Sequence, residues 1–152
     1  MAEQPAARSL TVYLEPLDRT VAVPAKAWAG DAAIDLPASE AGVLGPGRRH
    51  LVPTGFAIAV PDGACALVLP RSGLALNHGV TVLNAPGLID SGYRGEIKVV
   101  LINHGDDDFV YERGQRIAQL LVLRVPELNL VLVDDLPDAP DDRGANGFGS
   151  TG

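Results

Sequence analysis

Short apolar runs separated by turn residues dominate the chain, and this pattern predicts an all-β fold. The runs are rich in Val, Leu, Ile and Ala, and turns such as Gly45–Gly47 and Pro61–Gly63 divide them. Many short strands between such turns are typical of a sandwich, a jelly roll or a barrel. One short helix is expected from Ser72 to about Asn77. The predicted strands are Leu10–Leu14, His50–Val60, Ala64–Leu69, Val80–Leu83, Glu96–Asn103, Phe109–Tyr111, Ile117–Val125 and Leu128–Val133.

A change in composition divides the chain into two parts. Its 152 residues suit one domain, and we expect a β-domain over residues 1–133 and a C-terminal arm over residues 134–152. The arm is rich in Asp, Pro and Gly, and Phe148 is the only large apolar residue of its second half. Such a segment buries too little surface to fold alone. It is either a plain disordered end or, through Arg143–Gly152, a stretch that wraps phosphates and covers a base.

Charge and cysteine content narrow the function classes. The formal net charge of −7 argues against non-specific binding to DNA or to an anionic membrane, because both need a basic surface. Cys65 is the only cysteine, so no disulfide forms within the chain. The segment Met1–Ser9 lacks the apolar stretch of a signal peptide, and no apolar run approaches the roughly 20 residues of a membrane span. We therefore expect a cytoplasmic protein that binds neither nucleic acid nor membrane.

The segment Pro70–Ala75 follows an apolar run and opens the expected helix. Ser72 is a suitable N-cap, and the N-terminus of a helix favours anions. Arg71 adds a forked charge that suits phosphate. These residues are also compatible with an ordinary capped helix beside a solvated arginine.

A hairpin is expected where Pro86 and Gly87 favour a type II turn. Val80–Leu83 lies before this turn and Leu88–Ile89 lies after it. The open end of a hairpin presents backbone N–H and C=O groups, which can imitate the pairing edge of a base. The sequence therefore offers a candidate site for reading a nucleobase.

Several polar residues near these segments have a functional and a structural interpretation. Asp90, just beyond the expected hairpin, is a candidate site residue or a turn carboxylate, and Tyr93, three residues later, is a candidate site residue or a packed aromatic. Asp31 and Asp35 would share one face if they lay in a strand, but taken alone the segment favours a surface loop. Gln119 interrupts an apolar run, so it either reaches a polar partner or faces outward. The histidines lack metal-ligand spacing and are expected to be structural: His50, His78 and His104.

Taken in order, these segments resemble the five motifs of the trimeric dUTPases, from about Ala29 to the C-terminus. Any one motif is moderately specific, and all of them in order are very specific. The first motif keeps Asp35 but departs from the family pattern around it, at Ala33, Ile34 and Pro37. The segments closest to the family motifs are Pro70–Ala75, Asp90–Glu96 and Arg143–Gly152.

The resemblance implies a fold, an assembly and a reaction. The implied fold is a jelly-roll-like, distorted β-barrel with one short helix and a flexible C-terminal arm. The implied assembly is a homotrimer, with each site at an interface and built from more than one chain. The implied reaction is the Mg²⁺-assisted hydrolysis of dUTP to dUMP and pyrophosphate. This reaction supplies dUMP for thymidylate synthesis and keeps uracil out of DNA.

The resemblance also implies roles for individual residues. Asp90 would orient and deprotonate the attacking water, and Asp35 would hold Mg²⁺ through coordinated waters. Tyr93 under the sugar would exclude a 2′-hydroxyl, whereas Lys98 is either a substrate contact or a solvated strand residue. The implied substrate-binding residues are Arg71, Ser72, Gly73, Asn84, Leu88, Ile89, Tyr93, Lys98, Gln119, Arg143, Phe148, Gly149, Ser150 and Thr151.

Two other functions remain to be weighed. A dCTP deaminase shares the fold and an Arg-Ser motif, but Asp90–Gly95 and the terminal glycine-rich motif favour a dUTPase. A non-enzymatic β-barrel that binds a partner protein would leave the arginine, the phenylalanine and the hydroxyls of the arm without a purpose. A nucleotide-hydrolysis assay separates all three.

Overall fold

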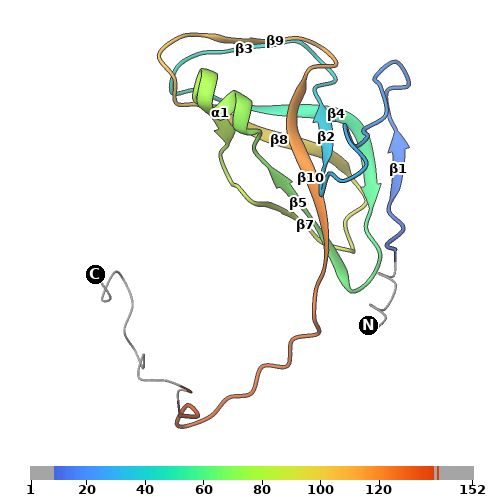
Figure 1. The fold of residues 1–152 in the computed structure, drawn as a ribbon, viewed down its shortest axis with the longest axis vertical. Coiled ribbons are helices and arrows are strands. Elements are labelled where there is room, and N and C mark those ends of the chain that lie inside the picture. The colour runs from blue at the N-terminus through green and yellow to red at the C-terminus, as the bar shows by residue number, and fades with distance from the viewer. Residues whose placement is uncertain (1–8, 139, 141–152) are drawn as a thin grey trace.

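The computed structural model describes residues 9–138 and 140, and it is built from short strands and one helix (Figure 1). The strands are β1 (Tyr13–Pro16), β2 (Ile34–Pro37), β3 (Gly42–Leu44), β4 (Arg49–Ala59), β5 (Ala64–Leu69), β6 (Val80–Val82), β7 (Gly87–Ile89), β8 (Glu96–Asn103), β9 (Phe109–Tyr111) and β10 (Arg116–Arg124). The helix is α1 (Ser72–His78).

Two four-stranded antiparallel sheets form the body of the fold. One has the order β1-β4-β8-β6 and the other the order β2-β10-β5-β7. Their strands alternate buried and exposed side chains, as in β8, where Ile97, Val99 and Leu101 are fully buried. Side chains from both sheets join one apolar core, so each sheet turns one face toward the other.

A two-stranded sheet of β3 and β9 closes one end of this core. Its inward side chains, Leu44, Phe109 and Tyr111, are buried in the same cluster as the two larger sheets. Val43 and Val110 lie opposite each other on its outer face and are exposed. The helix α1 lies near this end and buries one side chain, Leu74.

The all-β, jelly-roll-like fold with one short helix is confirmed. Among the described residues the strands pair into separate sheets, and their hydrogen bonds do not form a closed barrel. The helix forms where expected, but Ser72 is its first residue and not its N-cap. Arg71 occupies the N-cap with an extended backbone and makes no side-chain capping bond. No helix in the described part of the chain is long and apolar enough to cross a membrane.

The expected hairpin was wrong. Val80–Leu83 and Leu88–Ile89 do not form a hairpin, because β6 pairs with β8 while β7 pairs with β5 in the other sheet. The Ala85–Pro86 peptide bond is cis, and Gly87 does not have the positive φ of a type II turn. The strand β3 was not predicted, and the sequence favoured a surface loop around Asp31 and Asp35, of which Asp35 lies in the strand β2.

The predicted strand Leu128–Val133 is also absent. After β10 the chain leaves the body of the sheets (Figure 1) and no strand of the described residues pairs with it. Its large apolar side chains are exposed, and Leu132 is fully so. A strand needs a partner as well as a suitable sequence, and no strand of the described residues pairs with this segment.

Candidate active site

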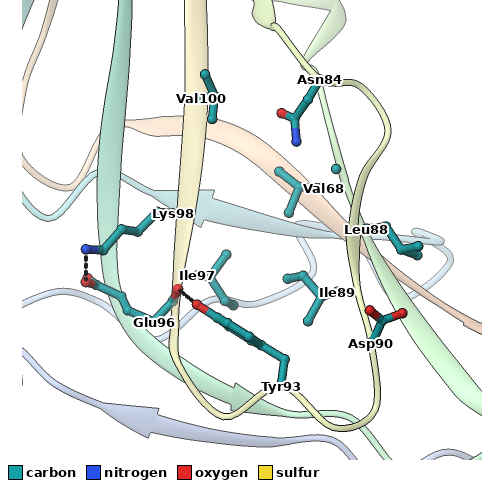
Figure 2. Close-up of a pocket in the computed structure, with 11 residues that line it drawn as sticks. Val68, Asn84, Leu88, Ile89, Asp90, Tyr93, Glu96, Ile97, Lys98 and Val100 are labelled. Atoms are coloured by element: carbon teal, nitrogen blue, oxygen red, sulfur yellow. Dashed lines mark hydrogen bonds and ion pairs between the residues drawn. The ribbon is translucent and has the colours of Figure 1, made fainter.

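A pocket of about 270 Å³ lies between β7 and the first half of β8 (Figure 2). Its floor is apolar, with Val68 from β5, Ile89 from β7 and Ile97 from β8. Polar groups surround this floor. The predicted site residues that line the pocket are Asn84, Leu88, Ile89, Asp90, Tyr93 and Lys98. An apolar slot with a few polar groups at its rim is the usual form of a small-molecule site.

The Tyr93 side chain lies beside the first residue of β8. Its hydroxyl donates a hydrogen bond to the backbone carbonyl of Glu96 at 2.7 Å (Figure 2), and the residue is 43% exposed. The Lys98 ammonium lies 3.7 Å from the Glu96 carboxylate. Figure 2 shows this ammonium turned toward Glu96, on the side of β8 away from Asp90. The pocket therefore presents a fixed phenol ring, while Lys98 is engaged in an exposed ion pair.

Asp90 directly follows β7 at the rim of the pocket and is exposed. Its backbone carbonyl accepts a hydrogen bond from the Tyr93 N–H at 3.1 Å, which makes a tight turn between the two residues. Within residues 9–138 and 140, no side chain donates to the Asp90 carboxylate. This carboxylate is therefore available to accept a proton from a bound water.

A second polar group gathers around Asp35 in β2. The Arg71 Nε lies 3.1 Å from one carboxylate oxygen, and the Arg116 Nη1 lies 3.1 Å from the other. Arg71 also donates through Nη1 to the Arg116 carbonyl at 2.8 Å. Gln119 faces Asp35 across the β2–β10 pairing, and its Nε2 donates to the Pro70 carbonyl at 2.8 Å. The group thus holds two guanidinium ions and one carboxylate at the start of α1.

Ser72 and Gly73 complete this second group. They are the first two residues of α1, and both are exposed beside Arg71. A Cβ added at Gly73 would meet nothing within 4 Å, so the backbone there is open to a ligand. Exposed N–H groups at the start of a helix and a forked guanidinium are both suited to phosphate oxygens.

The residues around Asp35 are compatible with a magnesium ion that is held mainly by the phosphate groups of a bound molecule and less by protein side chains. The described residues contain no cluster of three or more His, Cys, Asp or Glu that could bind a metal directly. Asp35 is the single carboxylate between the two arginines. Mg²⁺ commonly keeps its waters and binds through one or two carboxylates together with substrate phosphates. Asp31 lies in the loop before β2, where its carboxylate accepts the Trp28 N–H.

The two groups lie at opposite edges of one sheet. Asp35 belongs to β2 and Asp90 follows β7, and the strand order is β2-β10-β5-β7. Gln119 of β10 pairs with Asp35 on one side and with Leu69 of β5 on the other, so Asp35 and Leu69 lie at the same level along the strands. The pairing of Ile89 with Ala66, continued by one residue, places Asp90 at the level of Cys65. Three strand spacings across and four residues along a strand place the Cα atoms of Asp35 and Asp90 roughly 20 Å apart. One chain therefore does not bring all the described candidate residues together.

Two contributors were missed from the sequence. Arg116 pairs with Asp35, and Glu96 supplies the carbonyl that holds Tyr93. Arg116 lies three residues before Gln119 at the start of an apolar strand, and nothing in that spacing reveals its partner in β2. The remaining predicted site residues lie outside the described part of the chain: Arg143, Phe148, Gly149, Ser150 and Thr151.

Known proteins resemble this chain over most of its length. The family model described as dUTPase matches residues 19–152. A deoxyuridine 5′-triphosphate nucleotidohydrolase of Thermobifida fusca is 52% identical over 145 residues, which cover 95% of this chain and 80% of that protein. One of Caulobacter vibrioides is 54% identical over 134 residues and covers 86% of this chain and 85% of the relative.

Solved structures share the fold at lower identity. The dUTPase of Staphylococcus bacteriophage 80alpha with dUpNHpp has a TM-score of 0.84 at 23% identity, covering 93% of this chain and 98% of that one. A dUTPase variant from phage phi11 of S. aureus, described with a structural Mg(II) ion, has a TM-score of 0.78 at 20% identity and covers 84% and 99%. The family match over most of the length and the high identity to curated relatives show that the chain belongs to the dUTPase family.

Proposed function

We propose that the chain hydrolyses dUTP to dUMP and pyrophosphate in sites that its copies build together. As a member of the dUTPase family, with relatives named deoxyuridine 5′-triphosphate nucleotidohydrolase at more than half identity, it is a dUTP diphosphatase. The reaction is an attack of water on the α-phosphorus. A new P–O bond forms, the bond to the bridging oxygen breaks, and pyrophosphate leaves.

Asp90 orients the attacking water and takes its proton. The single observation that carries this proposal is the exposed Asp90 carboxylate at the rim of an apolar pocket, with no donor side chain from the described residues. A positioned base contributes about 10²–10⁴-fold to a rate. The Tyr93 N–H bond to the Asp90 carbonyl fixes the turn that carries the carboxylate.

The pocket beside β7 and β8 binds the deoxyuridine. Asn84 and the backbone of Leu88, Ile89 and Asp90 read the edge of uracil, and the apolar floor packs against the ring. Tyr93 lies under the sugar and leaves no space for a 2′-hydroxyl. Thymine is rejected because the slot has no room for its methyl group. Lys98 is a weaker candidate for a substrate contact, since its ammonium faces Glu96.

The group around Asp35 binds the triphosphate. Arg71 retains free N–H donors after its bonds to Asp35 and to the Arg116 carbonyl, because a guanidinium carries five. Ser72, Gly73 and Gln119 supply further donors. Mg²⁺ would be held by the phosphates and, through waters, by Asp35, and it would offset the charge that grows on the leaving pyrophosphate. The two guanidinium ions fix the Asp35 carboxylate in place for that contact.

A homotrimer accounts for the separation of the two groups. Since Asp35 and Asp90 lie at opposite edges of one sheet, the pocket of one copy is completed by the phosphate-binding group of another. The exposed apolar segment after β10 extends from the body of the chain and is suited to contact a neighbouring copy (Figure 1). In this proposal Arg143, Phe148, Gly149, Ser150 and Thr151 then close over the bound nucleotide. A cytoplasmic location fits an enzyme that acts on the nucleotide pool.

A nucleotide panel tests the proposed function. The full-length protein with Mg²⁺ is incubated with dUTP, dTTP, dCTP or UTP, and dUMP, pyrophosphate and ammonia are quantified. We expect pyrophosphate and dUMP from dUTP, little turnover of the other three, and loss of activity with EDTA. Ammonia released from dCTP would identify a deaminase. No turnover of any nucleotide by the folded protein would favour a binding module.

A further inference from the structure

We infer that Gly95 is a positioning residue for the sugar check, because the absence of a side chain there is what allows Tyr93 to lie against the start of β8. The inference rests on the proposed role of Tyr93 in excluding a 2′-hydroxyl. It adds a residue that does not line the pocket and lies behind the phenol ring.

The ring of Tyr93 occupies the space that a side chain at position 95 would need. A Cβ added at Gly95 would lie 2.5 Å from the Tyr93 hydroxyl oxygen, 2.7 Å from Cζ and 3.1 Å from Cε2. The φ of Gly95 lies outside the left-handed region that favours glycine. The backbone at this position therefore accepts alanine, and the tyrosine ring is what excludes it.

The backbone behind the ring is fixed, so it cannot retreat. Thr54 is fully buried and donates its hydroxyl to the Ile97 carbonyl at 2.7 Å. The Gly55 N–H donates to the Glu96 carboxylate at 2.9 Å, and the Ile58 N–H donates to the Gly95 carbonyl at 3.2 Å. Two of these bonds hold the backbone carbonyls of Gly95 and Ile97 to β4, and the third holds the Glu96 side chain to the irregular stretch between Pro53 and Ala57.

Because β4 holds the start of β8 in place, a side chain added at position 95 displaces the Tyr93 ring and not the strand. The Glu96 carbonyl, which accepts the Tyr93 hydroxyl at 2.7 Å, belongs to the anchored backbone. Tyr93 itself lies in an exposed turn. A methyl group at position 95 therefore displaces the ring and breaks its hydrogen bond, while β8 stays in place. With the ring displaced, the wall beneath the sugar is lost.

The test measures discrimination between dUTP and UTP as the ratio of their kcat/KM values. We expect Gly95→Ala to lower this ratio by at least about tenfold, which corresponds to about 1.4 kcal/mol of transition-state discrimination. Gly92→Ala is the matched control. It makes the same substitution in the same turn, at a position with no atom within 4 Å of the added Cβ and no positive φ. Its ratio should stay within about twofold of the wild type.

A double-variant cycle separates displacement of the ring from a general loss of structure. In a Tyr93→Ala background the ring is gone, so Gly95→Ala should add no further change to the ratio. If Gly95→Ala alone does not fold, Tyr93→Ala/Gly95→Ala should regain the elution volume and melting temperature of Tyr93→Ala. A wild-type ratio for Gly95→Ala, or an equal effect in both backgrounds, would overturn the inference.

The same measurements distinguish failure of this inference from failure of the proposed function. If Tyr93→Ala keeps the wild-type ratio, the sugar-checking role of Tyr93 is wrong and the inference falls with it. If Tyr93→Ala lowers the ratio while folded Gly95→Ala does not, Tyr93 keeps its role and only the positioning role of Gly95 is wrong.

Discussion

Asp35 and Asp90 lie at opposite edges of the same four-stranded sheet, Asp35 within β2 and Asp90 directly after β7. Two strands, β10 and β5, separate them. The carboxylate beside the arginines and the carboxylate beside the proposed nucleoside pocket are therefore too far apart within one chain for the proposed binding of a single nucleotide. The proposed chemistry needs both, so assembly is a requirement of the active site.

Mixing two inactive variants should therefore restore activity. Arg71→Ala removes a phosphate-binding group and Asp90→Asn removes the proposed base, and the two residues belong to different halves of the site. After joint unfolding and refolding, some interfaces pair the intact Asp90 of one copy with the intact Arg71 of another. We expect hydrolysis above the sum of the separate variants. Mixtures that stay inactive, or a stable active monomer in light scattering, would show that one chain holds a complete site.

Asp90→Asn alone should keep the fold and the binding of dUTP but lose hydrolysis. The amide has the same shape but cannot take a proton from water, so kcat should fall by about 10²–10⁴-fold. Asp62→Asn is the matched control, since Asp62 is exposed in the turn before β5. Calorimetric titration with dUpNHpp, a dUTP analogue bound by a structural relative, checks the binding. Near-wild-type turnover by Asp90→Asn would remove the water-activating role.

The sequence predicts the elements whose signal is local. The long β8 and the helix α1 appear where the apolar pattern places them, because alternation and turn residues are local properties. Leu128–Val133 has an equally good strand pattern and forms no strand in the chain. Gly42–Leu44 has a poor pattern and becomes a strand because β9 pairs with it. Pairing partners are long-range facts that composition does not record.

The same limit applies to the candidate site. Asp90 and Tyr93 lie three residues apart, and their contact through a turn follows from that spacing. The ion pairs of Asp35 with Arg71 and Arg116 join residues 36 and 81 positions apart. The residues Pro86 and Gly87 suggested a hairpin, yet the flanking strands belong to different sheets. The spacing of Asp90 and Tyr93 suits a turn, but the local signal of Pro86 and Gly87 gave the wrong turn type, and contacts between sheet strands left no local signal.

Arg116→Ala should change catalysis more than stability. The Arg116 side chain is 56% exposed, and exposed ion pairs contribute about 0–1 kcal/mol. We expect urea unfolding to shift by less than about 1 kcal/mol, because Arg71 still holds Asp35. The KM for dUTP and the Mg²⁺ concentration for half-maximal rate should rise, since the carboxylate loses one of its two anchors. Arg49→Ala, another exposed arginine at a strand start, serves as the control. Unchanged kinetics would restrict Arg116 to a surface ion pair.

Stability should fall in acid through Asp18. Hydrogen bonds from the Thr20 hydroxyl and N–H, together with the Arg113 guanidinium, lower the pKa of the Asp18 carboxyl from 3.8 to about 2. Because the folded pKa lies below the unfolded one, this contribution is present above about pH 3.8 and is lost as the pH falls toward 2. In urea titrations from pH 6 to pH 2, the stability difference between wild type and Asp18→Asn should therefore shrink. A difference that does not depend on pH would contradict this assignment.

Removing Asp141–Gly152 should spare the fold and the assembly but disable catalysis. The β-domain and its core are formed by residues that precede this segment, so the melting temperature should change little. We predict that Phe148 stacks on uracil and that Arg143, Ser150 and Thr151 bind the β- and γ-phosphates. A stack on a base contributes about 1–3 kcal/mol, whereas each backbone residue fixed on closure costs roughly 1–2 kcal/mol. Stacking alone therefore cannot hold the segment over the site, and the phosphate contacts must supply the rest.

This balance makes closure depend on the whole triphosphate. Phe148→Trp should retain activity, and its fluorescence should change with dUpNHpp but not with dUMP, which lacks the outer phosphates. Trp28 is exposed in the loop before β2 and gives a constant background that the variant Trp28→Phe removes. Phe148→Ala should be milder than the deletion, because it loses the stack and keeps the phosphate contacts. If the shortened protein hydrolyses dUTP as fast as the intact one, the segment has no part in the reaction.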